Sequence, residues 1–421
     1  MNNDNTLIPK YRFPAFKDEG NWSTYSISEI SEFRRGSFPQ PYGLPEWYDK
    51  INGFPFIQVF DVDENLKLKP FTKNKISLAA ANQSVFIKAG TLIVTLQGSI
   101  GRVAITQYDA YIDRTLLIFD DYKIDIDKYF YAYIIKLIFE IEKEKAPGGI
   151  IKTITKEVLS KFIVKIPSNP SEQQKIAACL SSLDDVIAGH EEKLTALEEH
   201  KKGLMQNLFP QEGETKPKYR FPDFENDGDW VEKKLGDIAN RITLKNKNSQ
   251  ITQIFTNSAE HGIVNQRDFF DKDIANQSNI EGYYIVEPGD FVYNPRVSSF
   301  APVGPIAKNN KNYAGAVSPL YTVFRFINPI NDFYVYYFKT KHWFNAIRKI
   351  ANTGARFDRM SITASQFMEI EVLMTSIKEQ QKIASVLSSV DELIVAQREK
   401  IEALKAHKKG LMQGLFPKIE S

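Results

Sequence analysis

Histidines and glycine-rich loops that could do chemistry are present in this chain, but their spacing indicates neither a catalytic nor a metal site. The five histidines show no metal-ligand spacing; they are His190, His200, His261, His342 and His407. No phosphate-binding Gly-x4-Gly-Lys-Ser/Thr loop is present. The Asn/Asp-Pro-Pro-aromatic tetrad that holds a flipped adenine is also missing, and the sequence Asn294-Pro-Arg-Val297 resembles it only superficially. We therefore expect no catalytic residue, metal or cofactor in this chain.

Composition predicts a globular protein with two domains. The chain has 421 residues, of which 43% are apolar and 25% charged. The most apolar run, from Tyr129 to Ile141, is too short to cross a bilayer and contains Lys136. Cys179 is the single cysteine, which excludes disulfides, and the N-terminus lacks a secretory signal, so we expect a cytoplasmic location. The net charge of +2 gives no compositional argument for nucleic acid.

Two long phrases each occur twice, about 207 residues apart. The first runs from Glu172-Gln-Gln-Lys-Ile-Ala177 to Lys201-Lys-Gly-Leu-Met-Gln-x-Leu-Phe-Pro210, and returns between Glu379 and Pro417. The second, Pro9-Lys-Tyr-Arg-Phe-Pro-x-Phe16, returns between Pro217 and Phe224. The stretches between the copies hardly align. The sequence therefore predicts two tandem units with a shared frame and different contents, divided as 1–170, 171–210, 211–377 and 378–421.

Segments 171–210 and 378–421 are predicted to be long helices. Their apolar residues alternate at intervals of three and four, which is the seam of a coiled coil. The predicted interface is Leu180, Leu183, Ile187, Leu194, Leu197 and Leu204 on one helix and Leu387, Val390, Ile394, Ile401, Leu404 and Leu411 on the other. Ser171-x-x-Gln174 and Ser376-x-x-Glu379 are expected to cap the helix starts. Gly203 and Gly410 indicate either close backbone approach or a break before a short final turn.

The two other segments share a plan without sharing much sequence. Each begins with a tryptophan and a helix-like turn, continues through strands that pivot on a glycine, and then enters an aromatic helix, from Tyr129 to Phe139 or from Phe333 to Ile350. We expect these aromatic side chains to form cores rather than base-stacking platforms. The predicted fold class is α+β: two mixed modules, each followed by a long helix. If the two helices pair antiparallel, a pseudo-twofold axis relates the two halves of the chain.

The whole pattern resembles the specificity (S) subunit of bacterial type I restriction-modification systems. The resemblance rests on two variable regions, each followed by a helix that starts with Glu-Gln-Gln-Lys-Ile-Ala and ends with Lys-Lys-Gly-Leu-Met-Gln-x-Leu-Phe-Pro. It implies two target recognition domains that read a bipartite asymmetric site in double-stranded DNA, as a non-catalytic part of a DNA-methylating defence complex. It also implies that the repeated helices form an antiparallel coiled coil that spaces the two domains. Two methyltransferase (M) and up to two restriction (R) subunits would dock, on which S-adenosylmethionine, ATP and Mg²⁺ would bind.

Candidate DNA contacts follow from side-chain chemistry. Forked donors and amides suit base edges, whereas lysines and hydroxyls suit phosphates. The predicted contacts are Lys73, Lys75, Gln97, Ser99, Arg102 and Lys152 in the first module, and Lys245, Lys247, Asn248, Asn294, Arg296, Ser298, Ser299, Arg356 and Arg359 in the second. Gly98 and Gly101 either admit a phosphate near the backbone or only form a hairpin turn. Two other classes stay open: a coiled-coil scaffold that never touches DNA, and a stand-alone DNA enzyme, which the missing motifs disfavour.

Overall fold

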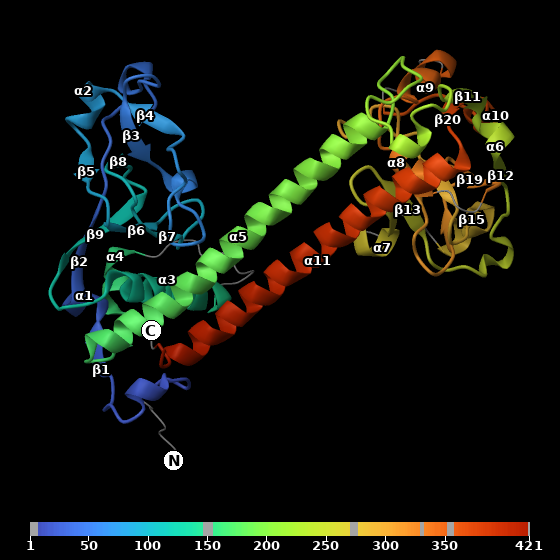
Figure 1. Cartoon of the computed structure of the whole chain (residues 1–421). Coiled ribbons are helices and arrows are strands. Elements are labelled where there is room, and N and C mark those ends of the chain that lie inside the picture. Colours follow the sequence, from blue (N-terminus) through green and yellow to red (C-terminus); the bar gives the residue numbers. More distant parts are fainter. Residues whose placement is uncertain (1–6, 146–154, 270–276, 329–331, 352–357, 420–421) are drawn as a thin grey trace. The chain divides into compact units, whose positions relative to one another are not determined.

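The computed structural model describes residues 7–145, 155–269, 277–328, 332–351 and 358–419. The chain forms two compact units: unit 1 is Met1–Lys193 with Gln397–Ser421, and unit 2 is Leu194–Ala396. The division falls within the two long helices of Figure 1, α5 (Pro170–Leu208) and α11 (Ile377–Leu415). Each unit therefore contains one module, the start of one long helix and the end of the other.

The apolar stripes predicted for α5 and α11 are covered in the structure. All twelve predicted interface residues are buried or half-buried. Within unit 1 the helices are joined by the ion pair Asp184–Lys408 and by the contact between His190 and Gln397. Residue numbers therefore increase along one helix as they decrease along the other, so the two helices run in opposite directions. In unit 2, Lys201 pairs with Asp391. The predicted antiparallel pairing is confirmed.

The two helix starts differ from each other. Ser376 precedes α11, and its hydroxyl accepts from the backbone N–H of Glu379 at 3.3 Å, as a capping residue does. The predicted cap at Ser171 is wrong, because α5 already begins at Pro170. The side chain of Asn169 takes that place and accepts from the N–H of Ser171 at 2.9 Å.

The glycines inside the long helices serve neither role predicted for them. A Cβ added at Gly203 or at Gly410 would meet no atom within 4 Å outside its own stretch of helix. Both helices also continue past these positions, to Leu208 and Leu415. The predictions of close approach and of a break are therefore both wrong.

The module of unit 1 contains two four-stranded sheets. One is antiparallel, in the order β2 (Ser31–Arg35), β9 (Leu116–Tyr122), β6 (Leu92–Thr95), β7 (Val103–Ile105). The other has the order β4 (Asn74–Ile76), β3 (Phe54–Ile57), β8 (Ala110–Ile112), β5 (Val85–Ile87), with β3 and β8 parallel. A separate ladder joins β1 (Ser23–Ser26) to β10 (Ile163–Ile166). The helices of this module are α1 (Ile27–Ile30), α2 (Leu78–Ala81), α3 (Lys128–Lys145) and α4 (Lys156–Lys161).

The module of unit 2 repeats the first sheet and the separate ladder. Its four-stranded sheet has the order β12 (Ala239–Ile242), β19 (Thr322–Phe326), β16 (Phe291–Tyr293), β17 (Ile306–Lys308). Strand β11 (Val231–Lys234) pairs with β20 (Glu371–Met374). Two antiparallel two-stranded sheets replace the second sheet, namely β13 (Phe255–Ser258) with β14 (Gly262–Asn265) and β15 (Tyr284–Val286) with β18 (Gly315–Val317). The short helices are α6 (Leu235–Ile238), α7 (Gln266–Phe269) and α10 (Ala364–Met368).

The aromatic helix of unit 2 is broken, contrary to the prediction of one helix from Phe333 to Ile350. The structure has α8 (Asp332–Tyr337) and α9 (Phe344–Ile350). Between them the chain forms a tight turn, in which the N–H of Lys339 donates to Tyr336 O. The indole of Trp343 donates to Phe338 O at 3.1 Å and takes a carbonyl that a continuing helix would use.

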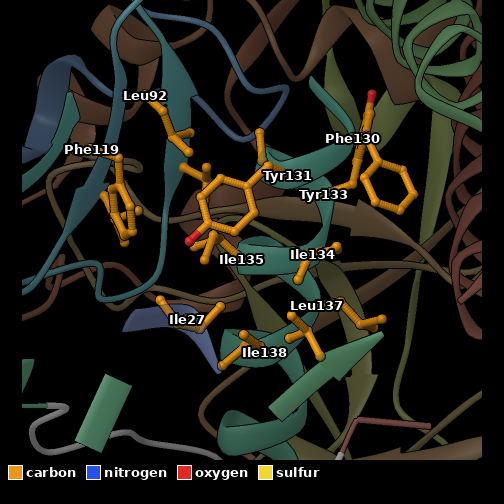
Figure 2. Close-up of a cluster of buried hydrophobic side chains, with 14 of the residues drawn as sticks. Ile27, Leu92, Phe119, Phe130, Tyr131, Tyr133, Ile134, Ile135, Leu137 and Ile138 are labelled. Carbon is orange, nitrogen blue, oxygen red and sulfur yellow. The ribbon is translucent and has the colours of Figure 1, made fainter. Parts of the chain in front are cut away.

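Aromatic side chains form the cores, as the sequence predicts. In unit 1 the α3 residues Phe130, Tyr131 and Tyr133 are buried with side chains of the sheet (Figure 2). Phe416, which directly follows α11, packs against Phe130 with ring centroids 5.3 Å apart. The equivalent contact of unit 2 joins Phe209, at the end of α5, to Phe333 at the same separation of 5.3 Å. The end of each long helix therefore completes the core of the other helix's module.

Candidate nucleic-acid interface

Two segments of unit 2 that are far apart in sequence lie side by side and carry predicted DNA contacts. Arg296 and Arg359 form an antiparallel bridge. The N–H of Met360 donates to Pro295 O at 2.9 Å, and that of Val297 donates to Asp358 O at 3.1 Å. The backbone thus brings two arginines from different loops to one place, where their forked donors suit base edges or phosphates.

The loop after Arg296 is exposed and ends in an apolar side chain. Ser298 and Ser299 are exposed, and the hydroxyl of Ser298 accepts from the N–H of Ala301 at 3.2 Å. Phe300 is 71% exposed. Sequence reasoning missed Phe300, although its position directly after two predicted contacts was a usable signal. An exposed aromatic ring beside arginines can stack on a base.

Asn294 holds this loop in place. Its side chain is 6% exposed. Its amide donates to Asn257 O at 3.0 Å and accepts from the N–H of Arg296 at 3.0 Å. In this conformation Asn294 positions Arg296 and does not present its amide to solvent.

A second exposed group in unit 2 surrounds the 3-10 turn η6 (Lys247–Ser249). Lys245, Lys247 and Asn248 are all exposed. Asn248 has φ +58°, a left-handed conformation that asparagine tolerates better than most residues. The buried Asn246 orders the turn, because its side chain bonds to the backbone of Ile251 in both directions, at 2.8 and 2.9 Å.

In unit 1, Lys73 is exposed beside an aromatic ring. Its ammonium lies 4.9 Å from the ring centroid of Phe60. Its backbone N–H donates to the buried carboxylate of Asp61 at 2.9 Å. Burial raises the pKa of Asp61, and that hydrogen bond opposes the shift. Lys75 lies half-exposed on β4, opposite Pro55.

The loop between β6 and β7 carries Gln97, Ser99 and Arg102. Gln97 and Ser99 are exposed, but Arg102 donates to Val62 O at 3.2 Å and to Glu64 at 3.3 Å. Gly98 and Gly101 have φ +65° and +83°, as a tight hairpin requires. A Cβ at Gly101 would lie 2.6 Å from the Cβ of Phe139. Gly101 is therefore explained by the turn and by packing against α3, whereas a phosphate approach at Gly98 stays a prediction.

Sequence reasoning missed two further features of unit 1. Phe71 is 87% exposed and lies two residues before Lys73. Tyr42 bonds to Asp113 at 3.1 Å and to Gln58, and the guanidinium of Arg114 lies 5.5 Å from its ring centroid. Phe71 could have been found from the sequence, because Pro70-Phe-Thr72 directly precedes a lysine. No spacing in the sequence indicated Arg114. Lys152 and Arg356 lie outside the described residues, and the whole set of predicted contacts stays a prediction.

A buried polar cluster joins module and long helices in unit 1. Asp184 on α5 pairs with Lys408 on α11 and accepts from the hydroxyl of Tyr133 on α3 at 2.7 Å. Burial and the nearby ammonium of Lys136 lower the pKa of Lys408 below its ordinary value. The cluster recurs in unit 2, where Asp391 pairs with Lys201 and accepts from Tyr336 at 2.9 Å.

A cavity of about 520 Å³ opens beside this cluster in unit 1. Its charged lining consists of Lys136, Lys143, Lys405, Lys408, Lys409, Glu64, Glu140 and Asp184. Two of these lysines are already paired, Lys405 with Glu191 and Lys408 with Asp184. Among the described residues no group of histidine, cysteine and carboxylate side chains could hold a metal ion. No helix in the described ranges is long and apolar enough to cross a membrane.

The repeated phrases meet in a buried ion pair in each unit. Arg12 donates to both carboxylate oxygens of Glu172, at 2.8 and 2.7 Å. Arg220 makes the same two bonds to Glu379, at 2.8 and 2.7 Å. Each arginine also bonds to two backbone carbonyls of the turn that follows it. These pairs fix the start of each long helix to the segment that precedes its module, a role that sequence reasoning did not assign.

Comparison with known proteins identifies this architecture. The sequence profile of the type I restriction modification DNA specificity domain matches residues 19–199 and 227–406. The chain belongs to this family. A curated relative, the type I restriction enzyme MjaIX specificity subunit of Methanocaldococcus jannaschii, is 28% identical over 229 residues. That match covers 52% of this chain and 51% of the relative, so it spans about half the length of each.

Solved structures of type I restriction-modification proteins share the fold. The S subunit from M. genitalium matches with a TM-score of 0.56 at 14% identity, over 98% of this chain and all of the other (100%). A second chain, from work on the complex assembly and conformational transition of the type I R-M system, matches with a TM-score of 0.55 at 15% identity. That match covers 96% of this chain and 98% of the other. At these identities the likeness concerns the fold alone.

Proposed function

We propose that this chain is the DNA specificity subunit of a type I restriction-modification complex. The proposal rests on one observation: the two modules share the same supporting elements but expose different polar side chains. Unit 2 holds the exposed Arg296 and the half-exposed Arg359 on bridged loops, whereas unit 1 exposes Lys73 and the Gln97–Ser99 loop. Sequence-specific reading needs such donors at base edges, and different donors read different bases. Each module would then read one half of a bipartite asymmetric site.

The chain itself would not catalyse a reaction. We infer that methylation and cleavage belong to partner subunits, two M and up to two R, which would bind S-adenosylmethionine, ATP and Mg²⁺. The exposed faces of α5 and α11 are the surface that would dock the M subunits. Their continuous helical surface supports this role, because an amphipathic helix can extend a bundle with helices of another chain.

A gel-shift experiment separates this function from a scaffold that never touches DNA. Duplex carrying the methylated motif of the source genome is incubated with the chain alone, with its M partner alone and with both together. The proposal predicts a specific shift only when the chain is present, and it predicts competition by the same duplex but not by a scrambled one. A complex with M that binds both duplexes equally would favour the scaffold.

A further inference from the structure

One exposed ion pair joins the long helices in unit 1. Lys405 of α11 lies 2.8 Å from the carboxylate of Glu191 of α5, and both side chains are partly exposed. The contact between His190 and Gln397 shows the repeat directly, because these residues are 207 positions apart. Applied to the ion pair, the same shift makes Arg398 the equivalent of Glu191 and Glu198 the equivalent of Lys405.

The two helices therefore carry opposite charges at equivalent positions. Helix α5 has glutamate at both, Glu191 and Glu198, whereas α11 has Arg398 and Lys405. All four occupy the same heptad position beside the apolar seam, where side chains of antiparallel helices face each other. If two copies of α5 paired in the same way, Glu191 of each copy would face Glu198 of the other copy. Two copies of α11 would place Arg398 against Lys405.

The centre of the seam is also asymmetric. The side-chain nitrogen of Gln397 lies 2.8 Å from Nδ1 of His190 and donates to His190 O at 2.7 Å. Gln397 is buried. Because the repeat makes these two positions equivalent, a pair of like helices would place histidine against histidine or glutamine against glutamine. A single buried polar position is known to specify pairing in coiled coils.

We propose that α5 and α11 are matched to select each other and to reject the like helix of a second copy. Repulsion between like charges removes the alternative pairings that the repeated seam would otherwise permit, as in designed partner choice. Every helix pair in an assembly of this chain then consists of one α5 and one α11. The consequence that the DNA site stays asymmetric rests on the proposed function, whereas the selectivity of the helices does not.

Charge-reversed full-length chains test the selectivity without DNA. Variant A carries Glu191→Lys and Glu198→Lys, and variant B carries Arg398→Glu and Lys405→Glu. Each should melt about 2 to 6 °C below the wild type, because facing charges become alike. The chain with all four substitutions restores the opposite charges and should melt within about 1 °C of the wild type. In 1 M salt, where screening acts over about 3 Å, the differences should shrink.

Mixing supplies the decisive readout. Variants A and B, unfolded and refolded together, have complementary helices only in each other and should give a fraction that elutes as a dimer with twice the mass of the chain. Variant A or B refolded alone should not give that dimer. Equal melting of all chains, or the same elution for A, B and their mixture, would overturn the selectivity and leave the DNA-reading proposal untouched.

Discussion

At the residue scale, the buried arginines explain why two separate phrases are repeated together. Arg220 is 7% exposed and Glu379 is 1% exposed, and the guanidinium binds the carboxylate with two parallel hydrogen bonds. A buried pair contributes little net stability over an apolar pair, but loss of one partner leaves a charge unpaired. The sequence predicted the repetition of both phrases, yet only the fold brings residues 159 positions apart into contact.

Arg220→Ala should therefore destabilise unit 2 by about 3 to 5 kcal/mol, because Glu379 loses the guanidinium that binds both of its carboxylate oxygens. Urea unfolding followed by the tryptophan signal measures the loss. Lys234→Ala, which removes an exposed ion pair with Glu369, is the matched control and should leave the midpoint unchanged. An Arg220→Ala chain that unfolds at the wild-type midpoint would contradict this role.

The arginine bridge makes a prediction about recognition. Arg359→Ala and Arg296→Ala should each weaken binding of the M-associated chain to its cognate duplex by about 1 to 3 kcal/mol if the arginine contacts a base. Titration of labelled duplex at fixed salt measures this. Lys341→Ala, which changes an exposed lysine before α9, should not alter the affinity. Cognate affinity that is unchanged in both arginine variants would remove this loop pair from the interface.

Asn294 shows what residue types alone do not reveal. Its amide suits adenine, so the sequence predicts a base contact, which stays a prediction. In the structure both ends of that amide order the loop that carries Arg296. Arg296 and Arg359 come from separate segments, and no spacing in the sequence predicts their adjacency.

At the element scale, periodicity predicted the long helices well because their stability depends on a regular seam. The predictions failed where one contact decides the outcome. Asn169 caps α5 in place of Ser171, and the Trp343 indole ends the turn that would join α8 to α9. Such side-chain bonds compete with helix continuation, and a spacing pattern does not contain them.

The burial of Lys408 predicts a pH dependence. Burial lowers the pKa of Lys408 in the folded state, while the unfolded value is about 10.4. Between these two values the unfolded chain binds more protons, so this group makes stability rise with pH. The difference in unfolding free energy between the wild type and Lys408→Met should thus grow as pH rises from the lowered pKa toward about 10. A difference that falls over that window would contradict the shift.

The end of α11 belongs to the core of unit 1, although it lies more than 200 residues from the rest of that core. Phe416→Ala removes a ring that packs on Phe130 and should cost about 3 to 5 kcal/mol. Amide hydrogen exchange should increase in α3 and its sheet, while the core around Phe333 keeps its protection. Phe209→Ala should give the reverse pattern. A uniform increase in both units would contradict separate cores.

At the scale of the whole molecule, the repeat in sequence and the repeat in structure are offset. The sequence divides the chain after each long helix, whereas the compact units divide it within α5 and α11. The fold class was predictable from the sequence because composition, seams and turns agree. The exchange of helix ends was not, because identical phrases end both helices and only packing decides which core each one enters.

The central claim is that this chain selects the DNA site for its methyltransferase partner. The most direct test maps modified adenines in DNA from cells that express the M subunit with this chain, without it, or with the Arg296→Ala and Arg359→Ala variant. We expect a bipartite asymmetric motif that disappears without the chain and loses sequence preference in only one half in the variant. A motif that persists without the chain, or one that is continuous and palindromic, would contradict it.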